Sequence, residues 1–548
     1  MKPINQNHRG ILVILFLLIF TIAGAQKAGI ESITIPDLES HMSFLASDEL
    51  EGRSTGEPGL YIAARYLASQ ASLLGLKAVD DNKDYVQNYV LIESSYDFEK
   101  NQITVEQAGN DPVVLKDDFF IIGGDVTEHY SIEAGVVFTG YGVVEPDHNY
   151  DDFAEVDIAG KFVLMMDRAP MDESGETIKF GEKYGDMQNI MIKYPNIAMR
   201  QAKGILLVMD PKSGYKSILE PAPFIKNFFG SSKSVKGAPT AGMFGQMPVP
   251  IILIHRNLAD QLLEGTGFSL DELQKKIDNS LDPHSFLVPD KTCRVDLYRK
   301  NREFNAPNIF GVIEGSDPKL KDEYVIYMAH FDHLGTDANG NVFNGADDNA
   351  SGSVALLEMA EAYMSEKKMP ARSIGFLWVS GEEIGLFGSG YYANNPIIPL
   401  NQTVTAINLD MVGRSRTERD NAAKSGQITV LGGDSIRVIG GLQSKVLMDI
   451  NRKSLAEMNI TGDFRYNRTD HPARYFYRSD HISFAQKDIP ILSFSTGTHV
   501  DYHKISDTAD KIDFEKYRNV TRFVYKVGYN VASYKGEITV DNPFTSWE

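Results

Sequence analysis

The sequence predicts an α/β fold in which a mostly parallel central sheet is flanked by helices, with a second, mainly β domain inserted into the first. Continuous apolar runs at residues 324–329, 373–380, 404–409 and 489–495 are typical of parallel strands buried on both faces. From residue 292 onward, such runs alternate with helical patterns, as βαβ units do. The main domain is therefore expected to comprise two stretches of chain.

The N-terminal residues 1–25 have the pattern of a secretory signal peptide. Lys2 and Arg9 precede an apolar run at residues 11–22, and Ala23-Gly24-Ala25 fits the small-residue cleavage pattern. An uncleaved anchor is the alternative, but a membrane span takes about 20 residues, and this run is shorter. We expect an exported protein, periplasmic or extracellular, with no stable membrane span after cleavage.

Residues 26–126 are predicted to form the first part of the main domain. Pro36 begins one helix, and Pro58 begins another that Gly75 ends. Residues 127–288 form the inserted domain, in which Gly and Pro are frequent and no catalytic cluster is evident. Residues 227–247 within it are predicted to be a mobile loop. The strand-like runs of the inserted domain are residues 135–142, 161–166, 204–209 and 249–254.

Residues 289–535 are predicted to complete the main domain, with a helix at residues 351–364 that places Leu356, Leu357, Ala360 and Met364 on one side. Residues 536–548 form a C-terminal tail without a clear pattern.

Composition excludes several classes of protein. The 548 residues carry a formal net charge of -20, which argues against binding to nucleic acid. The single cysteine, Cys293, allows no internal disulfide and no Cys-rich zinc site. A metal ion in this chain must therefore bind to His and carboxylate side chains. The oligomeric state does not follow from the sequence.

Each of the four apolar runs leads into side chains that can bind a metal ion, and an acidic loop lies between the first two runs. Ligands in open α/β sheets gather beyond the carboxyl ends of the strands. This arrangement indicates a metal-dependent hydrolase. The side chains are His330, Asp347, Asp348, Glu382, Glu383, Asp410, His499 and His503.

Each of these residues has an ordinary structural interpretation as well. Asp332 can face the same way as His330 and orient it, although a His-x-Asp triplet alone is weak support. Asp348 can bridge two metal ions or cap the following helix. Adjacent Glu382 and Glu383 can serve as base and ligand or form a solvated turn. Asp410 can bind metal or pair with a nearby arginine. The joint pattern favours the metal site.

Six motifs resemble those of the co-catalytic zinc aminopeptidases, a family that includes secreted bacterial leucyl aminopeptidases and relatives of glutamate carboxypeptidase. The order of the motifs is that of the family. The inserted region resembles a protease-associated domain, with lower specificity. The motifs are residues 329–335, 345–352, 381–386, 408–411, 479–481 and 501–503.

The resemblance implies a zinc exopeptidase fold, two zinc ions per chain and peptide substrates with a free N-terminus. By the resemblance, His330 and Asp410 bind one zinc ion, Glu383 and His503 bind the other, and Asp348 bridges them. It also implies that Glu382 is the general base toward a zinc-activated water and that Asp332 orients His330.

Three alternatives remain. A glutaminyl cyclase-like acyltransferase has the same fold with one zinc ion, and a receptor-like binding protein has it without the chemistry. The third is a serine hydrolase, because residues 52–56 match Gly-x-Ser-x-Gly; the polar residues before them do not form the required buried strand. The complete ligand set favours the peptidase.

Overall fold

The computed structural model describes residues 29–78, 84–107, 109–116, 119–123, 128–172, 180, 184, 189–221, 231–237, 248–423, 428–471 and 473–547. The expected signal peptide at residues 1–25 lies outside this range. The chain forms two compact units: the first comprises Met1–Val90 and Phe304–Glu548, and the second Leu91–Glu303. The second unit is wider than the expected insertion at residues 127–288, and its assignment as a protease-associated domain stays a prediction.

The first unit contains a sheet with the strand order β19-β18-β20-β17-β13-β16-β12. The four apolar runs form β13, β16, β17 and β20, which pair with their neighbours in parallel. β18 is antiparallel to β20, and β12 is antiparallel to β16. The predicted fold class, α/β with a mostly parallel sheet, is therefore confirmed. The bounds are β12 Ser285–Ile313, β13 Tyr324–His330, β16 Ser373–Val379, β17 Thr403–Leu409, β18 Ser435–Gly440, β19 Thr461–Asp463 and β20 Ile491–Ser495.

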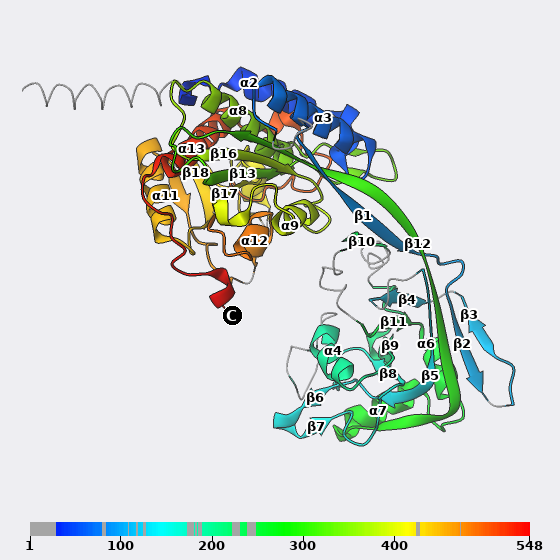
Figure 1. Ribbon diagram of the computed structural model, residues 1–548. Helices are drawn as coiled ribbons and strands as arrows, with labels where there is room; N and C mark the ends of the chain where they lie inside the picture. The colour runs from blue at the N-terminus through cyan, green and yellow to red at the C-terminus, as the bar shows by residue number, and fades with distance from the viewer. Residues whose placement is uncertain are drawn as a thin grey trace, which may run out of the picture. The chain divides into compact units, whose positions relative to one another are not determined.

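Helices cover both faces of this sheet (Figure 1). Along β13, Tyr327 and Ala329 pack into the core shared with α2, α8 and α13, whereas Ile326 and Met328 pack into the core shared with α9 and α12. Such alternation explains why the strands are apolar at every position. The helices are α2 Ile35–Leu45, α3 Pro58–Leu73, α8 Gly352–Met364, α9 Phe387–Asn394, α10 Glu418–Ala422, α11 Lys445–Met458, α12 His481–Ala485 and α13 Phe514–Ser533.

The helix starts follow from local sequence. The Thr34 side chain accepts the main-chain N–H of Asp37 and caps α2, and Pro36 occupies the first turn, where a missing N–H costs nothing. The expected helix at residues 351–364 is confirmed as α8. Of the residues predicted to share one side of it, Leu356, Leu357 and Ala360 are buried, whereas Met364, the last residue of α8, is 41% exposed.

The second unit has its own sheet, in which β5, β8, β9 and β11 are parallel, β4 is antiparallel to β11, and residues 285–298 of β12 are antiparallel to β5. Part of the expected mobile loop at residues 227–247 is strand β10, which pairs with residues of β1. The loop prediction was therefore wrong for residues 231–235. Residues 231–234 are polar, so they lack the apolar alternation from which a strand is predicted. The bounds are β1 Val86–Tyr96, β2 Gln102–Gln107, β3 Val113–Leu115, β4 Phe119–Ile122, β5 His129–Thr139, β8 Phe162–Met166, β9 Gly204–Val208, β10 Ser231–Val235, β11 Ile251–Ile254, α4 Asn189–Met199, α6 Arg256–Leu263 and α7 Leu270–Ser280.

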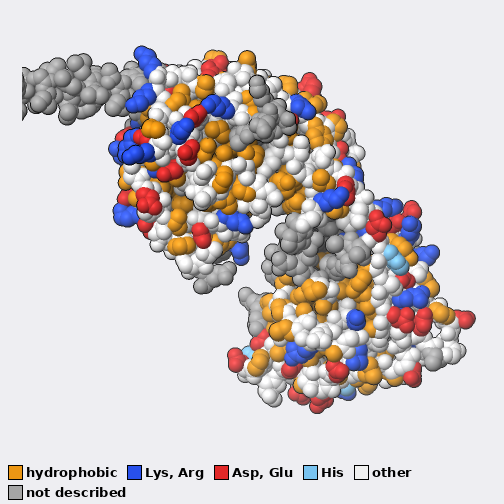
Figure 2. All heavy atoms as spheres, in the orientation of Figure 1, with side chains coloured by type: hydrophobic (Ala, Val, Ile, Leu, Met, Phe, Trp, Pro, Cys, Tyr) orange, Lys and Arg blue, Asp and Glu red, His pale blue; other side chains and the backbone are white. Residues whose placement is uncertain are grey.

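Acidic and basic side chains are interspersed on the face of each unit seen in Figure 2. None of the described helices combines the length and the apolar character that a bilayer span requires.

Candidate metal centre

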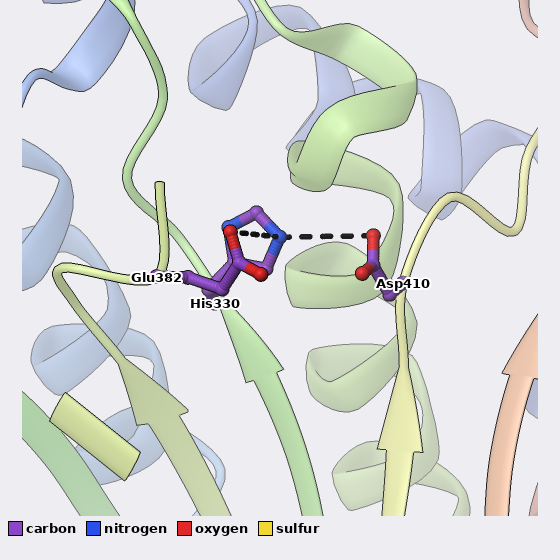
Figure 3. A group of neighbouring side chains, drawn as sticks. All are labelled: His330, Glu382 and Asp410. Carbon is purple, nitrogen blue, oxygen red and sulfur yellow. Dashed lines mark ion pairs between the residues drawn. The ribbon is translucent and has the colours of Figure 1, made fainter. Parts of the chain in front are cut away.

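The carboxyl ends of the parallel strands bring the candidate ligands together. His330 is the last residue of β13, Asp410 directly follows β17, and Glu382 follows β16 after a short turn. In Figure 3 the three side chains come from the ends of three separate strands and the turns that follow, and dashed lines join the His330 imidazole to the carboxylates of Glu382 and Asp410. Because β13, β16 and β17 are parallel, their ends meet at the same edge of the sheet.

His330 is the centre of the first group of side chains. Its Nε2 lies 3.5 Å from Asp348 Oδ1, 3.7 Å from Asp410 Oδ1 and 3.9 Å from Glu382 Oε2. This buried nitrogen has no hydrogen-bond partner within the described part of the chain. A buried nitrogen aimed at three carboxylates and bonded to none fits a metal ligand.

Asp348 joins the first group to a second one. Its Oδ2 lies 3.1 Å from His503 Nε2, which also lies 3.1 Å from Glu383 Oε2. One carboxylate thus contacts a histidine of each group through a different oxygen, as a bridging ligand must. The structure brings together all five residues that the sequence prediction singled out as metal ligands.

His333 is a member of the site that the sequence prediction did not single out. Its Nδ1 lies 2.7 Å from Glu383 Oε1 and 3.9 Å from Asp348 Oδ2. A Cβ at Gly345 would lie 2.5 Å from the His333 ring and 2.2 Å from the main-chain oxygen of Asp348. Glycine is therefore required there. The signal that could have identified His333 is its place three residues after His330.

The separations fit a pair of zinc ions. Zn–N and Zn–O bonds of about 2.0–2.1 Å place the ligand atoms of one tetrahedral ion about 3.3 Å apart. The observed separations are 3.5 and 3.7 Å around His330 and 3.1 Å around His503. Two groups of potential ligands, each of three residues, occur here: His330, Glu382 and Asp410, and His333, Asp348 and Glu383.

The electrostatics of the site show why cations are needed. Burial raises the pKa of Asp348 and raises the pKa of Glu382 well above its usual range. Burial would likewise raise the pKa of Glu383, but hydrogen bonds from His333 and His503 hold it well below its usual range. Burial would lower the pKa of His503, yet its contacts with Asp348 and Glu383 raise it to about 10. Like charges this close are costly unless positive charge neutralises them.

Asp332 lies next to His330, on the side of its Nδ1. His330 Nδ1 lies 3.3 Å from the main-chain oxygen of Asp332 and 3.8 Å from its Oδ1. The Asp332 carboxylate accepts a hydrogen bond of 2.9 Å from Thr55 Oγ1 and one of 3.2 Å from the Glu382 N–H. It therefore holds the Glu382 turn. That its carboxylate orients His330 stays a prediction.

The loop at residues 52–56, which matches the serine-hydrolase pattern, supports the site. Its first two residues belong to the 3₁₀ segment Asp48–Arg53, so Ser54 is not preceded by the strand that a nucleophile elbow requires. The buried Arg53 guanidinium donates hydrogen bonds to main-chain oxygens on both sides of the site, those of Phe331 at 2.8 Å and Gly345 at 3.0 Å.

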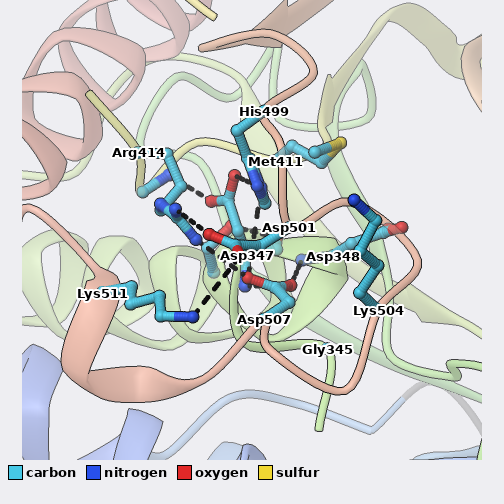
Figure 4. A network of polar contacts seen from close by, with 12 residues as sticks. Gly345, Asp347, Asp348, Met411, Arg414, His499, Asp501, Lys504, Asp507 and Lys511 are labelled. Carbon is cyan, nitrogen blue, oxygen red and sulfur yellow. Dashed lines mark hydrogen bonds and ion pairs between the residues drawn. The ribbon is translucent and has the colours of Figure 1, made fainter. Parts of the chain in front are cut away.

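A second acidic cluster lies beneath Asp348 (Figure 4). His499 Nε2 lies 3.2 Å from Asp347 Oδ2 without hydrogen-bond geometry, so His499 faces Asp347 and not the metal groups. Arg414 pairs with Asp501 at 2.7 Å and with Asp507 at 3.3 Å. Asp410 is therefore not neutralised by Arg414.

The 479–481 motif borders the site. Ser479 Oγ accepts a hydrogen bond of 2.9 Å from Asn408, and the His481 Nε2–H donates to the main-chain oxygen of Phe476 at 2.9 Å. The Nε2 of His481 is therefore occupied by a main-chain contact and is not available to a metal ion.

Comparison with known proteins agrees with this geometry. Residues 308–528 match the sequence model of Peptidase family M28. This stretch contains His330, Asp348, Glu382, Glu383, Asp410 and His503.

The chain carries a Peptidase family M28 domain.

The chain is similar in sequence to curated aminopeptidases. It is 32% identical over 119 residues to a probable leucine aminopeptidase of Arthroderma otae, which covers 21% of this chain and 32% of that protein. It is 34% identical over 122 residues to an aminopeptidase of Pseudomonas aeruginosa, covering 22% of this chain and 20% of that protein. The matched segments thus span a third or less of these relatives.

The fold is also that of a solved structure, the aminopeptidase from Aneurinibacillus sp. strain AM-1. The TM-score is 0.50 at 18% sequence identity, and the alignment covers 94% of this chain and 98% of that one. The match supports the architecture of the M28 domain.

Proposed function

We propose that this protein is a zinc-dependent aminopeptidase that removes N-terminal residues from peptides with two zinc ions. The observation that carries the proposal is the position of Asp348, which contacts His330 at 3.5 Å through one oxygen and His503 at 3.1 Å through the other. His330 and Asp410 would hold one zinc ion, Glu383 and His503 would hold the other, and Asp348 would contact both.

Glu382 is the proton carrier in this proposal. Zinc ions bound by these residues would supply Lewis acidity, which would lower the pKa of a bound water molecule and polarise the peptide carbonyl. Glu382 Oε2 lies 3.9 Å from His330 Nε2, at the edge of the first group. From there it accepts the proton of the attacking water and delivers it to the leaving nitrogen. Burial raises the pKa of Glu382, which helps it to retain that proton between the two steps.

The named relatives favour this activity over a glutaminyl cyclase or a receptor, because they are aminopeptidases. We also propose export, on the basis of the pattern at residues 1–25. Mass spectrometry of the mature protein from its natural host should find Gln26 at the N-terminus, and a retained Met1 would contradict export through cleavage.

Metal removal tests the activity. The purified protein is assayed on a panel of aminoacyl p-nitroanilides before and after dialysis against a chelator, with elemental analysis of each sample. We expect two zinc ions per active chain, loss of hydrolysis on chelation and recovery with added zinc. Full activity in a sample shown to contain no metal would refute the proposal. Inactivity of the zinc-loaded protein on every substrate would refute the aminopeptidase assignment.

A further inference from the structure

A cavity of about 240 Å³ lies beside Asp410. Its wall includes Asp410 itself, Arg437 from β18, Tyr475 and Tyr502. Because Asp410 is a proposed zinc ligand, a substrate group in this cavity lies next to the reacting peptide bond. The cavity is large enough for one amino-acid side chain and its nearest atoms.

Arg437 is the unusual residue of this wall. Its side chain is only 4% exposed, and its Nε has no hydrogen-bond partner within the described residues. A terminal nitrogen donates to the hydroxyl of Thr429, a neutral partner. Among the described residues, no carboxylate lies within 4 Å of Arg437 as an ion-pair partner. A buried charge without an opposite charge is costly and is rare in proteins.

Two aromatic rings fix the guanidinium in place. The Arg437 Cζ lies 4.7 Å from the ring centroid of Tyr466 and 4.4 Å from that of Tyr475. Burial lowers the pKa of Arg437, and the two tyrosines, Asp463 and Asp410 counteract this. Asp463, however, is already paired with Arg465 at 2.8 Å. The guanidinium is thus held rigidly, with part of its hydrogen-bonding capacity unused.

The rest of the wall suits an anionic group better than an aliphatic one. A second cation, Arg478, lines the cavity and lies 5.0 Å from the Tyr475 ring centroid. Only Met411 and Ile439 among the lining residues have aliphatic side chains. Most other lining residues carry hydroxyl groups. A leucine side chain would gain little here, whereas a carboxylate would pair with buried Arg437 through charge-assisted hydrogen bonds.

We propose that this cavity binds a carboxylate of the substrate, held by Arg437 and Arg478. This inference rests on the proposed aminopeptidase function and names its substrate class. The carboxylate has two sources, the side chain of an N-terminal Asp or Glu and the C-terminus of a dipeptide. It gives Arg437 the close ion-pair partner that none of the described residues supplies.

Matched substrates test the inference. Glutamyl and glutaminyl p-nitroanilides have the same shape and differ in charge, and a dipeptide can be compared with its C-terminal amide. We expect the zinc-loaded protein to prefer the charged member of one pair by about 10-fold or more in kcat/KM. Preference within the first pair identifies an acidic N-terminal residue, and preference within the second pair identifies the C-terminus. Hydrolysis of neutral substrates without preference in either pair overturns the inference and leaves the proposed function standing.

Arginine variants assign the preference to the cavity. We expect Arg437→Met to reduce the preference to near unity by lowering kcat/KM for the charged substrate. Arg478→Met should reduce the preference less, because Arg478 is exposed. This second variant keeps the test decisive if Arg437→Met does not fold. Arg474→Met is the control, because this exposed arginine stacks on Tyr477 and does not line the cavity. An unchanged preference in both cavity variants overturns the inference.

A binding measurement reports on the cavity without turnover. Glutarate should raise the unfolding temperature of the wild-type protein and of Arg474→Met, and should raise that of Arg437→Met much less. If the zinc-loaded protein hydrolyses no substrate, the proposed function fails and the glutarate result alone decides the cavity. Equal stabilisation of all three proteins, or none, overturns the assignment of Arg437.

Discussion

Asp507 Oδ2 accepts the main-chain N–H of Asp348 at 3.1 Å, and the same oxygen accepts the N–H of Asp347 at 3.0 Å (Figure 4). The proposed bridging ligand is thus held through its backbone by a buried carboxylate 159 residues later in the chain. We expect Asp507→Ala to weaken zinc binding by about 10–100-fold, the usual effect of losing a group that orients a ligand. Zinc titration of the folded variant measures this. Asp510→Ala, at an exposed position nearby, is the control, and equal zinc affinity in both variants would contradict the prediction.

Glu382→Gln should leave zinc content and folding nearly intact and lower turnover by about 100-fold to 10,000-fold, because the amide cannot carry a proton. Elemental analysis, circular dichroism and kcat together measure this. The exposed Glu49→Gln should behave as wild type. A Glu382→Gln protein with normal turnover would exclude Glu382 as the base.

His503 and His333 both contact Asp348 and Glu383, and zinc stoichiometry distinguishes their roles. If His503 is the ligand, His503→Ala should bind one zinc ion per chain. His333→Ala should still bind two, with weaker affinity, because His333 then serves to orient Glu383. The reverse result would transfer the ligand assignment to His333.

Zinc should stabilise the protein as well as activate it. The carboxylates of Asp348, Glu382, Glu383 and Asp410 are crowded together, and a cation relieves their repulsion. Free zinc at 1,000 times its dissociation constant should add about 4 kcal/mol to the free energy of unfolding. Scanning calorimetry of metal-free and zinc-loaded protein measures this. Magnesium, which prefers six oxygen ligands, is the control, and an equal response to both ions would argue against the site.

Glu358 on α8 should make the stability pH-dependent. Burial raises its pKa from 4.5 to about 8, and Glu361 and Asp37 add to the effect. Its Oε1 lies 3.7 Å from His41, but burial lowers the pKa of His41, so this partner is a weak source of charge. Because the folded pKa is the higher one, the associated stability is complete below about pH 4.5 and is lost as the pH rises through about 8.

Glu358→Gln should therefore unfold at a higher temperature than wild type at pH 8, by about 2–4 °C for each kcal/mol regained. The difference should shrink as the pH falls toward 5. Thermal unfolding at a series of pH values measures this, with the exposed Glu39→Gln as control. A difference that does not change with pH would contradict the assigned cause.

The sequence predicts the centre of the main sheet well and strands β10 and β12 less well. Residues such as Ile326 and Tyr327 are apolar because both faces of β13 are covered, and that pattern is visible in sequence. β10 carries no such pattern, since its polar residues 231–234 depend on pairing with β1. Nor did the pattern predict β12, whose 29 residues include polar stretches.

The proposed ligands could be found from sequence because each follows an apolar run or begins a helix. The residues that support them could not. Asp507 and Thr55 lie far from Asp348 and Asp332 along the chain, and only folding makes these contacts. Arg437 was missed because its significance is the lack of an acidic partner, which no sequence pattern shows.

Arg53 belongs to the first segment of the chain, yet three of the carbonyl oxygens that it binds belong to Phe331, Asn344 and Gly345. The family match begins only at residue 308. A protein trimmed to the matched residues would expose those oxygens, and Asp332 would lose the hydroxyl of Thr55. The smallest part of the chain that can maintain the structure of this site is therefore longer than the stretch that matches the family.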